Sequence, residues 1–409
     1  MKIKITLTFV FIFLLFLLSC EDWVSNVDPL IDRVEDERLN SPDQVGFLIL
    51  GIKTRFATTH DRLMVLSDLL SDQLFFDTNV PNATYPTFAE IDQGNIRLDN
   101  NSVDGVFYDL GELRFFADDL VRRVNENIEF AEGEESIKKD ALFNGYLYGG
   151  IARYFYAAYF GLNPDEGGGT IDNGPFIPSD AMYDSALVRL DKALEHVNHL
   201  NDKDYWTKVI NSIKARIYLL KGDYANAKTC AENGLVSGDA PFQSLHSSES
   251  DNYYWQQAGA GRTQCVADWR FKEYIDESPL EASRVKLDSI MGNNGVMYYR
   301  QGKYPQKESP IDFISWQENN LILAEIALRN GDNATALNLV NEVRQSHGLS
   351  DLTEIDMETL MIEKDKELCF TGLRLLDQRR IEGLWHLPAD AWKYLPITEG
   401  ERNINPNID

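Results

Sequence analysis

The sequence predicts an all-α protein of paired helices with one irregular, loop-rich insertion. Apolar residues recur at steps of three and four over long stretches, as on the buried face of a helix. Two separate segments repeat the same helix-turn-helix plan. Between them, residues 234–315 break the helical spacing with turn residues and short alternating runs. We therefore expect residues 41–409 to form a single helical body that carries an insertion at about residues 234–315.

The N-terminal residues form the pattern of a bacterial lipoprotein signal. Lys2 and Lys4 precede an apolar run from Phe9 to Leu18, and Leu17-Leu18-Ser19-Cys20 matches a lipoprotein cleavage box. The run is too short to span a bilayer, which takes about 20 apolar residues. Residues 1–19 are thus expected to be removed, and acyl chains on Cys20 would anchor residues 20–40 as a lipidated linker. The alternative is an ordinary signal peptide in which Cys20 is incidental.

Composition excludes one class of partner. The formal net charge is −26, and removing residues 1–19 takes away two of the 39 basic residues and none of the 65 acidic ones, which leaves −28. Such a surface repels nucleic acid, so no nucleic acid partner is expected. Beyond Cys20, only Cys230, Cys265 and Cys369 remain, and they permit at most one disulfide. The fold is not expected to depend on disulfides.

The first helix of the body is predicted to start at Ser41. The run Ser41-Pro42-Asp43-Gln44 offers an N-cap serine, a proline at the first helical position and a glutamine at the third. The apolar residues that follow share one face: Val45, Leu48, Ile49, Ile52 and Phe56. A long one-sided helix between Asn101 and Asn127 is predicted by a second set: Val103, Val106, Leu110, Leu113, Ala117, Leu120 and Val124.

A third helix is predicted from Ser136 to Gly161. Its inward residues are Ile137, Ala141, Tyr148, Ile151 and Phe155. The helix stops before the glycine-rich stretch from Asn163 to Pro178, which predicts a loop. The acidic part of that stretch lacks the spacing of a known calcium loop, so an acidic turn is expected there.

Two later segments have the same plan. Ala215 to Ala227 and Leu323 to Leu337 each predict a helix, a Gly-Asp turn and a second helix that begins with small residues. Small residues let the second helix approach the first closely. The plan resembles the unit of tetratricopeptide repeats, whose period is about 34 residues. Ser179 to Leu200 predicts a helix that could belong to an earlier unit.

The final third resembles the SusD/RagB family, the nutrient-binding outer-membrane lipoproteins of Bacteroidetes-type bacteria. The likeness rests on matching segments, in order: Lys303-Tyr304-Pro305, Asn320 to Glu325, Leu339 to Arg344 with Gly348-Leu349, Lys366 to Arg380, Tyr394 to Ile397 and Asn405 to Ile408. It extends backward over nearly the whole mature chain and is weakest in residues 234–315. Three features depart from the family: Thr371 replaces a usual glutamate, Asp365 a common basic residue, and the stretch from Arg380 to Tyr394 is short.

The polar residues of the final third are interpreted as structural. Glu367, Arg374, Asp377 and Arg380 lie at helical intervals, which predicts a semi-buried ion-pair network between the last helices. No nucleophile elbow, phosphate loop or dinucleotide motif occurs. His196 and His199 share a face without a third ligand, which favours a solvated pair over zinc. We expect no enzyme activity, no catalytic residue, no cofactor and no metal.

Aromatic residues in irregular segments are the candidate ligand-binding residues. Tyrosine and tryptophan rings stack on the apolar face of a sugar, and several are needed because each adds only about 0.5 to 1.5 kcal/mol beyond area burial. The candidates are Tyr85 and Phe88 after the first helix, with Tyr253, Tyr254, Trp255, Trp269 and Tyr298 in the insertion. For each one, packing in a core is the alternative.

The resemblance implies capture of a nutrient, most simply an oligosaccharide, at the cell surface and its delivery to a SusC-like TonB-dependent outer-membrane transporter. Glu21 and Asp22 after Cys20 are similar to an acidic signal for export to the outer face, so a lipid-anchored protein facing the exterior is expected. The main alternative is a tetratricopeptide-like lipoprotein scaffold that binds a protein or peptide. A third reading is a helical glycoside hydrolase.

Overall fold

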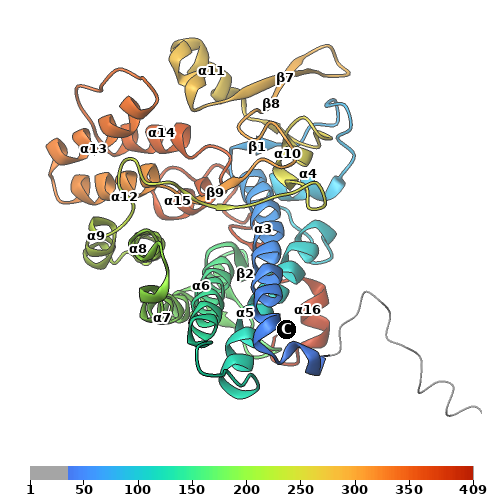
Figure 1. Ribbon diagram of the computed structural model, residues 1–409. Helices are drawn as coiled ribbons and strands as arrows, with labels where there is room; N and C mark the ends of the chain where they lie inside the picture. Colours follow the sequence, from blue (N-terminus) through green and yellow to red (C-terminus); the bar gives the residue numbers. More distant parts are fainter. Residues whose placement is uncertain (1–35, 409) are drawn as a thin grey trace, which may run out of the picture.

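The computed structural model describes residues 36–408 of the chain. The predicted signal peptide, Cys20 and most of the linker at residues 20–40 lie outside the described residues. No helix among the described residues is both long enough and apolar enough to cross a membrane. The described part is dominated by helices, with only short strands, as the fold class predicts (Figure 1).

Three long helices form the centre of the molecule, and three shorter ones continue the array on one side (Figure 1). They are α3 (Val45–Leu70), α5 (Asn101–Glu126), α6 (Glu135–Tyr159), α7 (Ser179–Glu195), α8 (Lys203–Leu220) and α9 (Tyr224–Glu232). The helices predicted from Asn101, from Ser136 and from Ser179 are therefore confirmed. The side chain of Asn100 caps α5 by accepting hydrogen bonds from the N–H groups of Ser102 and Val103, at 3.1 and 3.2 Å.

The helix predicted to start at Ser41 begins as a short 3-10 turn. Pro42–Gln44 form this turn, and α3 follows directly, but the Ser41 side chain makes no capping hydrogen bond. The second half of α3 is buried on almost every side because it runs through the middle of the fold (Figure 1). As a result, the polar residues His60, Asp61 and Asp68 are buried there.

Parts of the glycine-rich stretch are strands of a small sheet, so the loop prediction for Asn163 to Pro178 is wrong for those parts, while residues 170–176 form no helix or strand. The strands are β2 (Phe160–Asn163), β3 (Glu166–Gly169), β4 (Ile177–Pro178) and β10 (Leu395–Pro396), in the order β10-β2-β3-β4. The glycines allow large rings to lie against the backbone: a Cβ on Gly169 would come within 2.6 Å of Tyr156 Cδ1.

The two helix-turn-helix segments are confirmed and pack together. α8 and α9 form one pair, and α12 (Trp316–Arg329) and α13 (Asn333–Ser346) form the other, with α12 against both α8 and α9. Gly222 and Gly331 have φ values of +74° and +76°, a region that favours glycine. The following aspartates, Asp223 and Asp332, cap the second helices.

The segment between the two pairs carries several short elements. They are β5 (Phe242–Ser244), α10 (Tyr253–Ala258), β6 (Val266–Ala267), α11 (Trp269–Glu277), a 3-10 turn (Pro279–Ser283), β7 (Leu287–Met291), β8 (Met297–Gln301) and β9 (Ile311–Ile314). β5 pairs with β9 near the two ends of the segment, and β7 and β8 form a hairpin. β6 pairs with β1 (Leu74–Phe75), which follows α3.

The remaining elements complete the two ends of the body. They are two 3-10 turns (Asp36–Leu39 and Val197–His199), α4 (Pro86–Asp92), α14 (Met357–Glu367), α15 (Arg374–Arg380) and α16 (Glu399–Ile404). Cys230, Cys265 and Cys369 are all buried and free.

The predicted ion-pair network of the final third is divided between separate centres. Arg380 forms ion pairs with both Asp377 and Glu325, and Glu325 is fully buried. Arg374 instead pairs with Asp72, which follows α3. The division arises because the chain turns sharply between α14 and α15, where Phe370 and Gly372 have positive φ.

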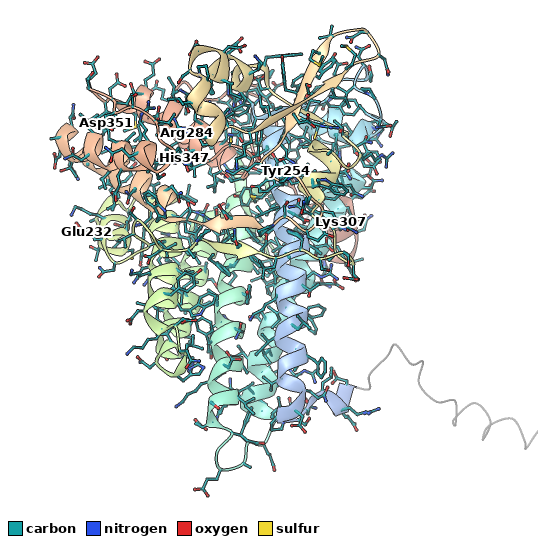
Figure 2. The ribbon with its side chains drawn as sticks, turned by 45° about the horizontal axis from the view of Figure 1, so that its top comes forward. Glu232, Tyr254, Arg284, Lys307, His347 and Asp351 are labelled. Carbon is teal, nitrogen blue, oxygen red and sulfur yellow. The ribbon has the colours of Figure 1, made fainter. Side chains whose placement is uncertain are left out.

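The third centre holds Glu367, which pairs with Arg284 and His347. Figure 2 labels these two partners, which come from distant parts of the chain. The distance from Glu367 Oε2 to His347 Nε2 is 2.9 Å. Because α14 ends at Glu367, this carboxylate does not share a helix with Arg374. The spacing in the sequence therefore predicted the pair of Asp377 and Arg380 correctly, but the partners of Glu367 and Arg374 lie elsewhere in the sequence.

Candidate functional site

A groove lies beside the upper end of α3 in Figure 1, where α3, α5, α10 and the turn before α4 meet. We call it the Tyr85–Tyr253 groove. Its volume is about 520 Å³, and its lining residues are Arg62, Leu66, Tyr85, Pro86, Thr87, Asn101, Ser102, Gly105, Val106 and Tyr253. The fold thus brings together two of the predicted aromatic residues from distant parts of the chain.

Tyr253 is the first residue of α10 and is half-buried. The guanidinium carbon of Arg62 lies 5.6 Å from the centre of its ring. Arg62 is itself held by Asp109 on α5, at 2.6 Å between Nη1 and Oδ2. Burial raises the pKa of Tyr253 above its usual value, so the hydroxyl keeps its proton and can donate a hydrogen bond.

Tyr85 also lines the groove and stands immediately before α4. Arg262 covers its ring, with the guanidinium carbon 4.7 Å from the ring centre, and Arg262 Nη1 donates to the Tyr85 hydroxyl at 2.8 Å. The ring of Phe88 packs edge-on against Tyr85 at 5.5 Å. Tyr85 is therefore a ring held in place by a cation and by a second ring.

Small polar groups also line the groove. The hydroxyls of Thr87 and Ser102 lie 2.9 Å apart, and Asn101 is exposed at the start of α5. None of the described residues that line the groove is a carboxylate, a histidine or a cysteine. The groove thus combines aromatic faces with hydrogen-bonding groups and has no acid–base pair in its lining, a composition suited to binding.

Three of the predicted ligand-binding residues are buried, and for them the prediction is wrong. Phe88 and Tyr254 are fully buried, and Tyr298 is 2 % exposed. The Tyr254 hydroxyl donates to Asp68 at 2.7 Å inside the fold (Figure 2), and the Tyr298 hydroxyl donates to Asp77 at 2.7 Å. Neighbouring residues on a helix point about 100° apart, so Tyr253 faces the groove while Tyr254 faces the core.

The two predicted tryptophans lie outside the groove. Trp255 is half-buried and its ring packs against the turn at Gly261. Trp269 is 38 % exposed and lies among Phe75, Tyr298 and Tyr299, at ring distances of 5.9, 5.3 and 5.9 Å. We call these four residues the Trp269 cluster; it fastens the β7–β8 hairpin to β1 and α11.

Sequence reasoning missed both arginines of the site. Arg262 and Tyr85 are 177 residues apart, and no local spacing connects them. The same holds for Arg62, whose role depends on α10 lying beside α3. The only available signal was the presence of basic residues in a strongly acidic chain, which does not identify partners.

A second groove lies between α5 and α16, and we call it the Tyr108 groove. Its volume is about 630 Å³, and Tyr108, Phe115 and Ile404 are exposed along it. Its charged groups already have partners within the protein, as in the ion pair between Arg114 and Asp172. Among the described residues, no group of three histidine, cysteine, aspartate or glutamate side chains could hold a metal ion.

Comparison with known proteins places the fold. No family model and no curated protein matches the chain. Solved structures do match. A SusD superfamily protein from Bacteroides vulgatus is 13 % identical in sequence, with a TM-score of 0.69, and the match covers 90 % of this chain and 97 % of the other chain.

Two further structures match over the same extent. A SusD superfamily protein from Bacteroides thetaiotaomicron is 16 % identical with a TM-score of 0.67, covering 90 % of this chain and 99 % of its own. Surface glycan-binding protein A from Bacteroides uniformis is 15 % identical with a TM-score of 0.67, covering 90 % and 98 %. The chain therefore has a SusD-like fold, as the resemblance in its final third implied.

Proposed function

We propose that the protein binds a carbohydrate at the cell surface, in the Tyr85–Tyr253 groove, and delivers it to a SusC-like TonB-dependent transporter. The observation that carries this proposal is the groove itself, where two tyrosines meet an arginine and small polar groups with no carboxylate in the lining. The fold supports it, because one structure that shares the fold is described as a surface glycan-binding protein.

The chemistry of the groove suits an oligosaccharide. Its volume of about 520 Å³ is within the usual range of small-molecule sites, roughly 300–1,000 Å³. A sugar ring stacked on Tyr253 or Tyr85 would present its hydroxyl rim to Arg62, Asn101 and Ser102. Two stacking contacts of about 0.5 to 1.5 kcal/mol each, added to buried area and hydrogen bonds, suit modest affinity near the −8 kcal/mol of micromolar binding.

Modest affinity also suits delivery. A protein that passes its ligand to a transporter must release it, so binding without bond breaking is the required activity.

The lipid anchor on Cys20, the exterior location and the SusC-like partner are part of the same proposal, and they depend on the signal pattern of residues 1–22 and on the resemblance. Incorporation of radiolabelled palmitate, lost on Cys20→Ala substitution, tests the anchor. Recovery of a large barrel protein in pull-downs from outer membranes tests the partner.

A second candidate function is a scaffold that binds a protein or peptide. The observation in its favour is the Tyr108 groove, where large apolar side chains are exposed together. On this alternative the Tyr108 groove, and not the Tyr85–Tyr253 groove, carries the function.

A binding experiment separates the two functions. The soluble chain without residues 1–20 is screened on a glycan array, and the affinity for the best glycan is measured by calorimetry. We expect Tyr85→Ala and Tyr253→Ala each to weaken binding about tenfold, while Tyr108→Ala, an exposed tyrosine of the other groove, leaves it unchanged. No glycan binding, or a loss caused by Tyr108→Ala alone, contradicts the proposal. Hydrolysis products after long incubation would indicate an enzyme instead.

A further inference from the structure

Two buried polar side chains hold the backbone at the two tyrosines of the groove. The first is Gln264, which is fully buried. Its Oε1 accepts hydrogen bonds from the N–H groups of Thr84 and Tyr85, at 2.8 and 3.1 Å, and its Nε2 donates to the carbonyl of Asn82. Both ends of this one amide thus bind the turn that presents Tyr85.

The second side chain is Asp61 on α3, which is 1 % exposed. Its Oδ2 accepts a hydrogen bond from the N–H of Tyr253 at 2.7 Å, and its Oδ1 accepts from the N–H of Arg62 at 2.7 Å. One carboxyl group therefore sets the backbone of both partners in the Arg62–Tyr253 contact. Burial raises the pKa of Asp61 to about 8.

The hydrogen bonds of Gln264 and those of Asp61 are connected through α10. The backbone N–H of Gln264 donates to the carbonyl of Gln257 on α10 at 2.6 Å. The turn that carries Tyr85 is thus bound through Gln264 to α10, which carries Tyr253, and α10 is bound through Asp61 to α3. Neither Gln264 nor Asp61 lines the groove. A buried amide or carboxyl group is costly unless its hydrogen bonds are made, and the bonds made here are largely to the backbone of the site.

We propose that Gln264 and Asp61 are positioning residues of the Tyr85–Tyr253 groove, which fix the spacing and orientation of its two tyrosines without touching the ligand. This inference rests on the proposed function, because the spacing matters only if a ligand stacks between or upon these rings. It assigns the positioning of the two tyrosines to two side chains outside the lining of the groove.

The test uses double-mutant cycles on glycan affinity. Gln264→Met keeps the size of the side chain and removes its hydrogen bonds, and we expect it to weaken glycan binding about tenfold. In a Tyr85→Ala background the same change should weaken binding by less than about twofold, since Gln264 acts through Tyr85. Asp61→Asn, which leaves one acceptor where two are needed, should couple to Tyr253→Ala in the same way.

The matched control is Gln73→Met. Gln73 is also a buried glutamine whose Oε1 accepts a backbone N–H, that of Phe370 at 2.7 Å, but it is not part of the groove. We expect Gln73→Met to lower the melting temperature as Gln264→Met does and to leave glycan affinity unchanged. Any general loss of stability is thereby separated from positioning.

Hydrogen exchange gives a readout that needs no ligand. Amide exchange in a peptide covering residues 82–88 should accelerate in Gln264→Met and stay unchanged in Gln73→Met. If the wild type binds no glycan while exchange behaves as expected, the proposed function is wrong, but Gln264 still fixes the turn that carries Tyr85. If the wild type binds through Tyr85 and Tyr253 but Gln264→Met and Asp61→Asn bind as well as wild type, or weaken binding equally in the tyrosine-deficient backgrounds, the positioning role is overturned.

Discussion

The helix pairs and the segment between them use buried charge in opposite ways. In the helix pairs, Glu325 is fully buried, and although burial alone would raise its pKa, Lys364, Arg380 and Arg329 hold it well below the usual value. At the other region, α10 is bound to α3 by Asp61 and Asp68, and burial raises their pKa values to about 8 and about 7.

Because of this difference, the stability of the two regions is expected to depend on pH in opposite directions. A carboxyl group with a depressed pKa contributes stability that is present above its unfolded pKa and lost as pH falls through its folded pKa. A carboxyl group with a raised pKa contributes stability that is present below its unfolded pKa and lost as pH rises through its folded pKa. The stability that Glu325 contributes to the helix pairs is therefore kept at neutral and basic pH. The stability that Asp61 and Asp68 contribute to the attachment of α10 is largest at acidic pH.

The largest expected effect comes from Glu325→Gln. Removing this carboxylate leaves Lys364 and Arg380 buried together with too little negative charge. We expect a loss of about 3–5 kcal/mol of unfolding free energy, measured by urea denaturation at pH 7. The control is Glu358→Gln, an exposed glutamate of α14, which should change stability by less than about 0.5 kcal/mol. A loss below about 1 kcal/mol for Glu325→Gln would mean that the ion pairs of Glu325 contribute little to the stability of the fold.

The next effect is a change in pH dependence from Asp68→Asn. Asp68 accepts hydrogen bonds from the Tyr254 hydroxyl and from the N–H of Gly372, and its folded pKa of about 7 exceeds the unfolded value of 3.8. The stability of wild type relative to Asp68→Asn should therefore fall between pH 5 and pH 7, by about 2–3 kcal/mol at about 1.4 kcal/mol per pH unit. Urea midpoints of both proteins at several pH values give the difference. A difference that stays constant from pH 5 to pH 7 would show that Asp68 is ionised in the folded protein throughout this range.

A smaller effect is expected from Trp269→Ala. The ring is 38 % exposed and packs on Tyr298 and Phe75. Its removal should cost about 1–2 kcal/mol, less than the roughly 3–5 kcal/mol of a fully buried aromatic ring. Glycan affinity should not change, because Trp269 does not line the Tyr85–Tyr253 groove. Thermal unfolding and calorimetry on one sample measure both quantities. A loss of affinity without a loss of stability would place the ligand on the Trp269 cluster.

The smallest effect is expected from Arg262→Ala. This exposed arginine covers the ring of Tyr85 and bonds to its hydroxyl, contacts worth about 0.5–1 kcal/mol at a solvated site. Glycan binding should weaken about two- to fivefold. Arg300→Ala, which removes an arginine of the β7–β8 hairpin paired with Asp288, is the matched control and should leave affinity unchanged. Equal effects of the two substitutions would exclude a specific role for Arg262.

Much of the helical part follows from local sequence. The spacing of apolar residues predicted α5 and α6 within one or two residues, and Gly222 and Gly331 marked the turns because each must take a positive φ. The sheet at Gly167–Gly169 could not be predicted in this way, since part of its support is β10, which lies at the other end of the chain.

The candidate site was predictable only in part. Tyr85 and Tyr253 were selected because aromatic residues in irregular segments are candidates for stacking, and both line the groove. The same argument also selected Tyr254, which is buried. Which of two neighbouring tyrosines faces the groove depends on how α10 lies against α3, and that is set by Asp61 and Asp68, residues distant in sequence. Periodicity determines burial within a long helix, but in α10, a helix of six residues, tertiary contacts determine it.

The most direct test is a crystal structure of the protein with the glycan that it binds best on an array. The account predicts sugar density in the Tyr85–Tyr253 groove, with one ring stacked on a tyrosine and hydroxyls within hydrogen-bond distance of Arg62 or Asn101. Density confined to the Tyr108 groove or to the Trp269 cluster would contradict it.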